Sequence, residues 1–303
     1  MSNRLFAFGC SFTRYGWPTW ADIMGQKFDS YENWGASGAG NQYIFNALIE
    51  CDIRNKITPN DTVTIMWTNF CRDDHYERGR WQLHGNVYHT ELFDSEDRHR
   101  IRGYYIRDLA TIHATRLLLE ARGCQYHFMS MVDIDNPLQY QAANAGDYVN
   151  DLLNHYQETL DQILPSVHRT IFDLDWHSRP FCPEFSQQQV RKNYEDNAGP
   201  DWPSWEQYMA QDFLNVPRSV LKEILDNPQW NWRDWFHSMK RGDFHPTPAE
   251  HLEYLNTVLP EYQFDHQTVL LIHEIDAKIR NKEEYEDLLN NFTNNVQDWP
   301  RRW

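Results

Sequence analysis

The sequence predicts an α/β protein, a three-layer α/β/α sandwich around a parallel sheet of about five strands. Short apolar runs typical of buried strands alternate along the chain with segments whose apolar residues recur at helical spacing. This alternation is typical of a parallel sheet covered by helices on both faces. The chain has 303 residues, of which 41% are hydrophobic, so it is long enough to bury a sizeable core.

Five runs predict the strands of the sheet. The clearest is TVTIMW, which is rich in β-branched residues and follows the turn sequence Pro59-Asn60-Asp61. The first is a short apolar run that ends in glycine. In chain order, the predicted strands are Leu5–Gly9, Tyr31–Trp34, Thr62–Trp67, Gln125–Val132 and Arg169–Leu174.

Helical spacing predicts the elements between and after these strands. The strongest pattern ends at Arg122, where Gly123 is suited to a helix C-cap. The predicted helices are Trp17–Met24, Gln42–Arg54, Tyr104–Arg122, Tyr148–Leu164, Pro246–Leu259 and Thr268–Asn291. The polar, His-rich segment Arg72–Arg102 is interpreted as a long excursion from the sheet.

The pattern predicts one main domain over residues 1–260 and an acidic C-terminal helix and tail over 261–303. Residues 176–241 are rich in Pro and Trp and are interpreted as an insertion, helical near Val216–Leu225. Aromatic rings stack on sugar faces, but these rings are equally suited to a small core within the insertion.

Composition excludes several classes of partner. The formal net charge of −16 disfavours binding to nucleic acid and to anionic membranes. No apolar run approaches the length of a membrane span, and the N-terminus lacks the pattern of a signal peptide. The five cysteines are scattered without a CxxC pair, which favours a reducing compartment, so we expect a cytoplasmic protein.

Four short segments place polar groups at the carboxyl edge of the predicted sheet, where open parallel sheets bind ligands. Ser11 offers a hydroxyl nucleophile, His245 a base, and Asp243 a carboxylate to orient that base. The backbone N–H groups of Ser11 and Gly38 and the side-chain amide of Asn69 are candidate donors to an oxyanion.

Each of these residues also has a structural explanation. Ser11 is suited to capping the next helix, Gly38 and Asn69 to forming turns, and His245 to a surface position. Cys10 is an alternative nucleophile or a buried packing residue. Asp133 and Asp135 follow the fourth strand and are suited to substrate contact or to capping a turn. The spacings of four loop histidines fit no metal site: His75, His84, His89 and His99.

Taken together, the four segments resemble the SGNH hydrolase family, also called GDSL esterases and lipases. GCSF corresponds to the family's first block, NWGASGAGN to its second, MWTN to its third and GDFHP to its last. The resemblance implies an SGNH/flavodoxin-like fold, a Ser11-His245-Asp243 triad and an oxyanion hole made by Ser11, Gly38 and Asn69. It implies neither a metal nor an organic cofactor.

The sequence departs from the family pattern in two places. The family's acid stands three residues before the histidine, where this chain has Gly242, so Asp243 lies one residue closer. Asp173, Asp175 or a backbone carbonyl is the alternative partner for His245. In the third block, WTNF keeps only the asparagine of the family pattern.

The resemblance leads to the expectation of a serine ester hydrolase that acts on a carboxylic ester, with an acylated carbohydrate as one substrate class. The alternative is a non-catalytic virion structural or binding protein on the same fold. A third hypothesis is an acyltransferase that uses the same residues. GCSFT together with Trp67, Thr68 and Arg72 is similar to bacteriophage SGNH proteins, which would imply virion association. A homo-oligomer or virion proteins are the expected protein partners.

Overall fold

A computed structural model of the protein describes residues 3–70, 72–77, 80–86, 98–134, 146–171, 245–281 and 283–292. The chain divides into two compact units. The first comprises Met1–Leu174, Pro246–Ile279 and Glu284–Trp303, and the second Asp175–His245 and Arg280–Glu283. The insertion predicted at 176–241, with its helix near Val216–Leu225, lies outside the described residues. No helix in the described part of the chain is long and apolar enough to span a bilayer.

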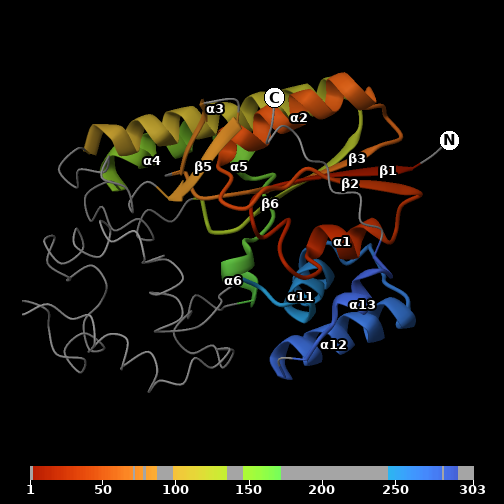
Figure 1. The fold of residues 1–303 in the computed structure, drawn as a ribbon. Helices are drawn as coiled ribbons and strands as arrows, with labels where there is room; N and C mark the ends of the chain where they lie inside the picture. The colour runs from red at the N-terminus through yellow and green to blue at the C-terminus, as the bar shows by residue number, and fades with distance from the viewer. Residues whose placement is uncertain are drawn as a thin grey trace, which may run out of the picture. The chain divides into compact units, whose positions relative to one another are not determined.

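The first unit is built on a four-stranded parallel sheet (Figure 1). Its strands are β1 (Arg4–Phe8), β2 (Ser30–Asn33), β3 (Thr62–Trp67) and β6 (Gln125–Ser130), in the spatial order β2-β1-β3-β6. Every residue of β3 is buried, as expected for a strand covered on both faces. The predicted α/β class and parallel sheet are therefore confirmed.

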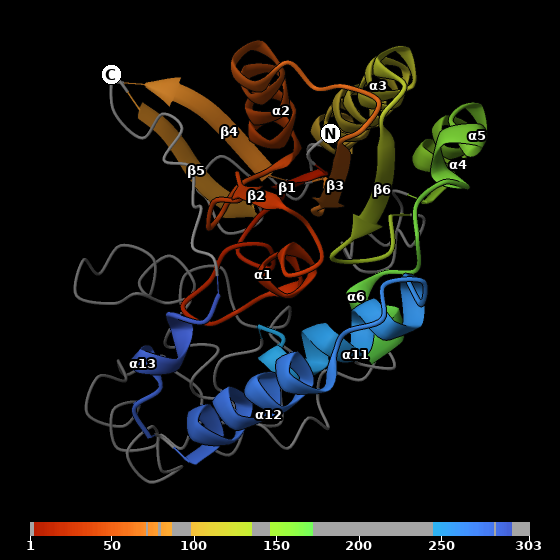
Figure 2. The same ribbon diagram turned by 90° about the vertical axis from the view of Figure 1, so that its right-hand side faces the viewer.

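Helices lie on both faces of this sheet. Figures 1 and 2 show α2 and α3 over one face and α1 and α11 over the other. The helices are α1 (Trp20–Gly25), α2 (Asn41–Asn55), α3 (Arg98–Arg122), α4 (Gly146–His155), α5 (Gln157–Leu160), α6 (Val167–Ile171), α11 (Pro248–Val258), α12 (His266–Asn281) and α13 (Glu286–Leu289). Gly123 follows α3 with a φ of 68°, the left-handed conformation expected of a glycine C-cap.

The segment interpreted as an excursion contains an antiparallel hairpin of β4 (Arg72–Glu77) and β5 (Arg80–Asn86). Asp74 attaches it to the start of α2, since its carboxylate accepts hydrogen bonds from the N–H groups of Gly40 (2.9 Å) and Tyr43 (3.0 Å). Trp81 and Tyr43 form a T-shaped ring pair, with the centroids 5.7 Å apart. The helix α3 begins at Arg98, within the segment interpreted as an excursion and before the predicted helix start at Tyr104.

The fifth strand, predicted at Arg169–Leu174, is wrong over the residues that the structure describes there, because Val167–Ile171 forms α6. Ser166 caps this helix by accepting a hydrogen bond from the N–H of Arg169 at 3.1 Å. The residue that pairs with β6 on this side is instead Ile163, which forms an isolated parallel bridge with Phe128. The sheet thus has four strands among the described residues.

Two predicted helices are each divided in the structure. The helix predicted at Tyr148–Leu164 is interrupted at Tyr156, whose N–H is shared between the carbonyls of Leu152 and Leu153. A shared bond of this kind tightens the last turn and ends α4. The C-terminal helix predicted at Thr268–Asn291 begins earlier, at His266, where Asp265 accepts from the N–H of Thr268, and ends at Asn281 before α13.

Candidate active site

Ser11 lies on the turn that follows β1. The turn is closed by hydrogen bonds from the N–H groups of Thr13 (2.9 Å) and Arg14 (3.1 Å) to the carbonyl of Cys10. The carbonyl of Thr13 in turn accepts from the Thr19 hydroxyl at 2.6 Å and the Asn33 amide at 2.8 Å. These buried contacts fix the backbone on both sides of Ser11.

The structure does not support a capping role for Ser11. The helix that follows, α1, is capped by Thr19 through a complete capping box with Asp22. The Ser11 hydroxyl has no hydrogen-bond partner among the described residues, and the residue is 7% exposed. A nearly buried hydroxyl without a structural partner is the state expected of a nucleophile that acts with a base from elsewhere in the chain.

The loop that carries Gly38 runs directly beside the Ser11 turn. The N–H of Trp34 donates to Ala7 at 2.8 Å, and the N–H of Ala36 donates to Gly9 at 3.0 Å. These bonds continue the parallel pairing of β1 and β2 beyond the ends of both strands. The two loops therefore leave the sheet at the same edge.

Gly38 is required by the local geometry. Its φ is +79°, which L-residues with a side chain rarely adopt. A Cβ at this position would lie 2.7 Å from the carbonyl oxygen of Leu83 in β5. The turn and the hairpin alone therefore explain the glycine, so its presence is not by itself evidence of an oxyanion donor.

Asn69 follows β3 at the same edge, since β3 pairs with β1 through Phe8 and Ile65. The preceding residue, Thr68, exchanges hydrogen bonds with the Asn41 side chain at the start of α2, at 3.0 and 3.3 Å. The Asn69 side chain does not close a turn; its Oδ1 accepts from Nε of Arg72 at 3.3 Å. The side chain is 8% exposed.

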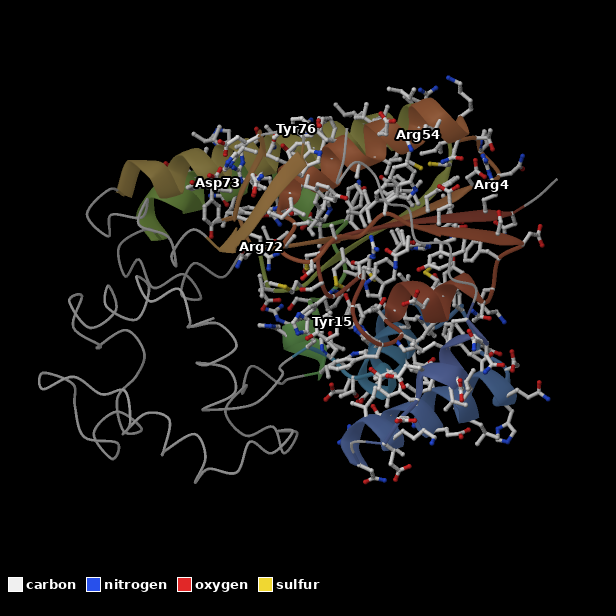
Figure 3. All side chains as sticks on the ribbon, viewed as in Figure 1. Arg4, Tyr15, Arg54, Arg72, Asp73 and Tyr76 are labelled. Atoms are coloured by element: carbon white, nitrogen blue, oxygen red, sulfur yellow. The ribbon has the colours of Figure 1, made fainter. Side chains whose placement is uncertain are left out.

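Arg72 and Met131 connect the three loops. The Arg72 guanidinium donates to the carbonyl of Ala39 at 2.6 Å and contacts the Met131 sulfur at 3.8 Å. The same sulfur lies 3.8 Å from the thiol of Cys10, the neighbour of Ser11. Figure 3 shows Arg72 at the end of the sheet opposite Arg4, the first residue of β1. The sequence pattern indicated no role for Arg72 in the site.

Two acidic side chains lie behind these loops, the buried Asp108 and the half-buried Asp74. Asp108 accepts from Asn41 at 2.9 Å and from Nε of Arg107 at 2.6 Å. Burial raises the pKa of the Asp108 carboxyl to about 7, although both partners favour its charged form. Burial likewise raises the pKa of Asp74. No sequence pattern could indicate this cluster, because its members come from distant segments and meet only in the folded chain.

The raised pKa of Asp108 predicts a pH dependence of stability. The folded state holds a proton on this carboxyl that the unfolded state releases near pH 4, so the stability that this group contributes falls as the pH rises toward about 7. We expect the melting temperature to fall between about pH 5 and 7 and Asp108→Asn to flatten that fall. Asp265→Asn, at an exposed cap whose pKa is lowered, is the control and should keep the wild-type slope. Equal slopes in wild type and Asp108→Asn would contradict the assignment.

His245 is half-buried and immediately precedes the segment that leads into α11. The carbonyl of its neighbour Pro246 accepts a hydrogen bond from Nε1 of Trp17 at 2.9 Å, and Thr247 caps α11 with Glu250. His245 belongs to the second unit, so its pairing with Ser11 stays a prediction. Asp243, Gly242 and the alternative acids Asp173 and Asp175 lie outside the described residues.

The remaining candidates have structural roles or fall outside the described chain. Cys10 is fully buried. Asp133 accepts from the Ser166 hydroxyl at 2.6 Å and lies 3.0 Å from Nε of Arg169. His75 lies 3.7 Å from Asp73, and no group of three metal-ligating side chains occurs among the described residues. Nothing is described of the side chains of His84 and His99, or of residues Asp135 and His89.

Comparison with known proteins gives a likeness at the level of structure. No protein-family model and no curated protein matches the sequence. Among solved structures, the chain is similar to a member of the lipolytic protein G-D-S-L family from Veillonella parvula DSM 2008. The two share 13% sequence identity with a TM-score of 0.34, over 60% of this chain and 87% of that one. A likeness of this degree leaves function to be argued from the residues of this chain.

Proposed function

We propose that the protein is a serine ester hydrolase with Ser11 as nucleophile, His245 as general base and Asp243 as the residue that orients His245. The observation that carries the proposal is the state of Ser11. Its backbone is fixed in a turn at the carboxyl edge of the sheet, and its hydroxyl has no hydrogen-bond partner among the described residues. A serine that served only the fold would cap a helix or close a turn.

The proposed reaction is acyl transfer to water. The Ser11 oxygen bonds to the ester carbonyl carbon while its proton passes to His245, and the carbonyl electrons move onto oxygen. The tetrahedral intermediate then expels the alcohol, which takes the proton from His245. Water attacks the resulting acyl-serine, and His245 accepts a proton from the water and returns one to Ser11. The products are an alcohol and a carboxylic acid.

The proposed oxyanion hole consists of the N–H groups of Ser11 and Gly38 and the side-chain amide of Asn69. It is supported by the contacts that join the three loops, from Ala36 to Gly9 and from Arg72 to Ala39 and Asn69. Preorganised donors of this kind stabilise the charge that develops on the carbonyl oxygen.

The role of His245 is supported by the attachment of the next residue. Pro246 is held by Trp17, which follows Ser11 on the same loop. This contact attaches Pro246, which belongs to the first unit, to the segment that carries the nucleophile. Asp243 is proposed as the acid that orients His245, and Asp173 or Asp175 is the alternative.

The proposed substrate is a carboxylic ester, such as an acylated carbohydrate.

The test combines turnover with active-site labelling. The purified full chain is assayed with p-nitrophenyl acetate and butyrate and is treated with a fluorophosphonate probe, which phosphonylates activated serines. We expect one equivalent of label on the peptide that contains Ser11, and turnover that the probe abolishes. A protein that hydrolyses neither ester and takes up no label would overturn the proposal and favour a non-catalytic structural or binding protein.

A further inference from the structure

We propose that Arg72 is the positioning residue of the oxyanion hole and sets which end of the Asn69 amide faces the substrate. The inference rests on the proposed function and deepens it. Arg72 begins β4, its side chain is nearly buried, and its three nitrogens reach Asn69, Ala39 and Met131. It thus contacts two of the three loops that carry the proposed donors directly.

The orientation of Asn69 follows from the chemistry of its partner. A guanidinium carries only donors, so the atom of Asn69 that faces Nε of Arg72 must be the carbonyl oxygen Oδ1. The amide nitrogen Nδ2 is then directed away from Arg72 and can donate elsewhere. If the amide flipped, Oδ1 would face the oxyanion and repel it.

Arg72 also holds the loop that carries Gly38. Its Nη1 donates to the carbonyl of Ala39 at 2.6 Å, a short, charge-assisted bond. This bond fixes the peptide between Ala39 and Gly40, one residue beyond the proposed donor Gly38. One side chain therefore sets the relative position of two proposed oxyanion donors that lie far apart in the sequence.

Arg72 forms no salt bridge with a carboxylate among the described residues, although the charge of Asp74 lies close enough to interact with it. Its hydrogen-bond acceptors there are an amide, a backbone carbonyl and a thioether. The nearby acid Asp74 uses its carboxylate on the N–H groups of Gly40 and Tyr43. A largely desolvated cation beside the oxyanion hole would favour the charge of the transition state over that of the ester.

Arg72 is itself held in place by the buried cluster behind it. Its backbone carbonyl accepts from Nη2 of Arg107 at 2.8 Å, and Arg107 is paired with Asp108. Asp74, two residues further along β4, attaches the strand to α2. The guanidinium thus extends from a fixed backbone, as preorganisation of a site requires.

A double-mutant cycle tests the inference. We expect Asn69→Ala to lower kcat for p-nitrophenyl acetate by about 100-fold, as loss of one oxyanion donor does. Arg72→Met should lower kcat by about 30-fold with KM nearly unchanged. In the Asn69→Ala background its effect should fall to about 5-fold, because the part that passes through Asn69 is already lost there, while the hold on Ala39 and the positive charge are still removed. Arg72→Lys keeps the positive charge, so its loss of kcat should lie between those of the wild type and Arg72→Met. This variant takes the place of Arg72→Met in the cycle if Arg72→Met does not fold.

Arg116 provides the matched control. Its side chain is as buried as that of Arg72 and pairs with Glu158 on α5, outside the proposed site. Arg116→Met should lower the melting temperature and leave kcat unchanged. If the wild type is active and depends on Ser11, but the losses from Asn69→Ala and Arg72→Met multiply, the positioning role is wrong and the esterase stands. If the wild type neither hydrolyses the esters nor takes up the fluorophosphonate label, the proposed function and the positioning role of Arg72 are both wrong.

Discussion

Replacing Ser11 with alanine is expected to lower kcat/KM for p-nitrophenyl acetate by about 10⁴-fold or more, without loss of stability. The nucleophile supplies most of the rate in enzymes of this mechanism, and only binding and the oxyanion hole remain without it. The Ser11 hydroxyl has no hydrogen-bond partner among the described residues, so its removal should leave the melting temperature within about 2 °C of wild type. His245→Ala should cause a loss of similar size.

Ser37→Ala is the matched control for this experiment. Ser37 lies in the neighbouring loop, beside Gly38, but its side chain is exposed. We expect this variant to retain full activity. If Ser11→Ala stays active, the nucleophile is another residue. If Ser11→Ala is inactive but His245→Ala stays active, Ser11 remains the nucleophile and a residue other than His245 is the base.

Replacing Gly9 with alanine is expected to lower the free energy of unfolding by about 3 kcal/mol, the upper part of the range for an overpacked core position. A Cβ at Gly9 would lie 2.0 Å from the hydroxyl oxygen of Thr13 and 3.1 Å from the carbonyl oxygen of Met66 in β3. Thr13 is fully buried, so it cannot move aside cheaply. Urea unfolding followed by circular dichroism measures the change.

Two further variants separate the contact from a general effect of alanine. A Cβ at Gly16 would meet no atom of the described chain within 4 Å, so Gly16→Ala should leave stability unchanged. Adding Thr13→Ala to Gly9→Ala removes the hydroxyl and should restore part of the lost stability. If Gly9→Ala and Gly16→Ala behaved alike, the close approach of the Ser11 turn to β3 would be contradicted.

The features that the sequence predicted well are those encoded in short segments. The strand Thr62–Trp67 was predicted with the bounds that the structure gives, because β-branched residues and the turn before it act locally. The positions of Ser11, Gly38 and Asn69 at one edge also follow from the order of parallel strands. Their proximity needs only that each loop leaves the carboxyl end of its strand.

The features that the sequence could not predict depend on partners far along the chain. The β4–β5 hairpin has a polar sequence without a clear apolar alternation, and it is attached to α2 through Asp74 and Trp81. The predicted strand at Arg169–Leu174 has apolar residues suited to either state, and the capping by Ser166 favours a helix there. The link from Arg72 to Asn69 joins two side chains whose meeting depends on the hairpin and cannot be read from spacing.

The strand order has a consequence for how the chain folds. β1 is translated first yet lies in the interior of the sheet, where it pairs with β2 on one side and β3 on the other. The helix α11, which packs against α1, follows only at Pro248. A nascent chain therefore carries its first apolar strand incompletely covered through most of its synthesis, and because every pairing in the sheet is non-local, folding is expected to be slow.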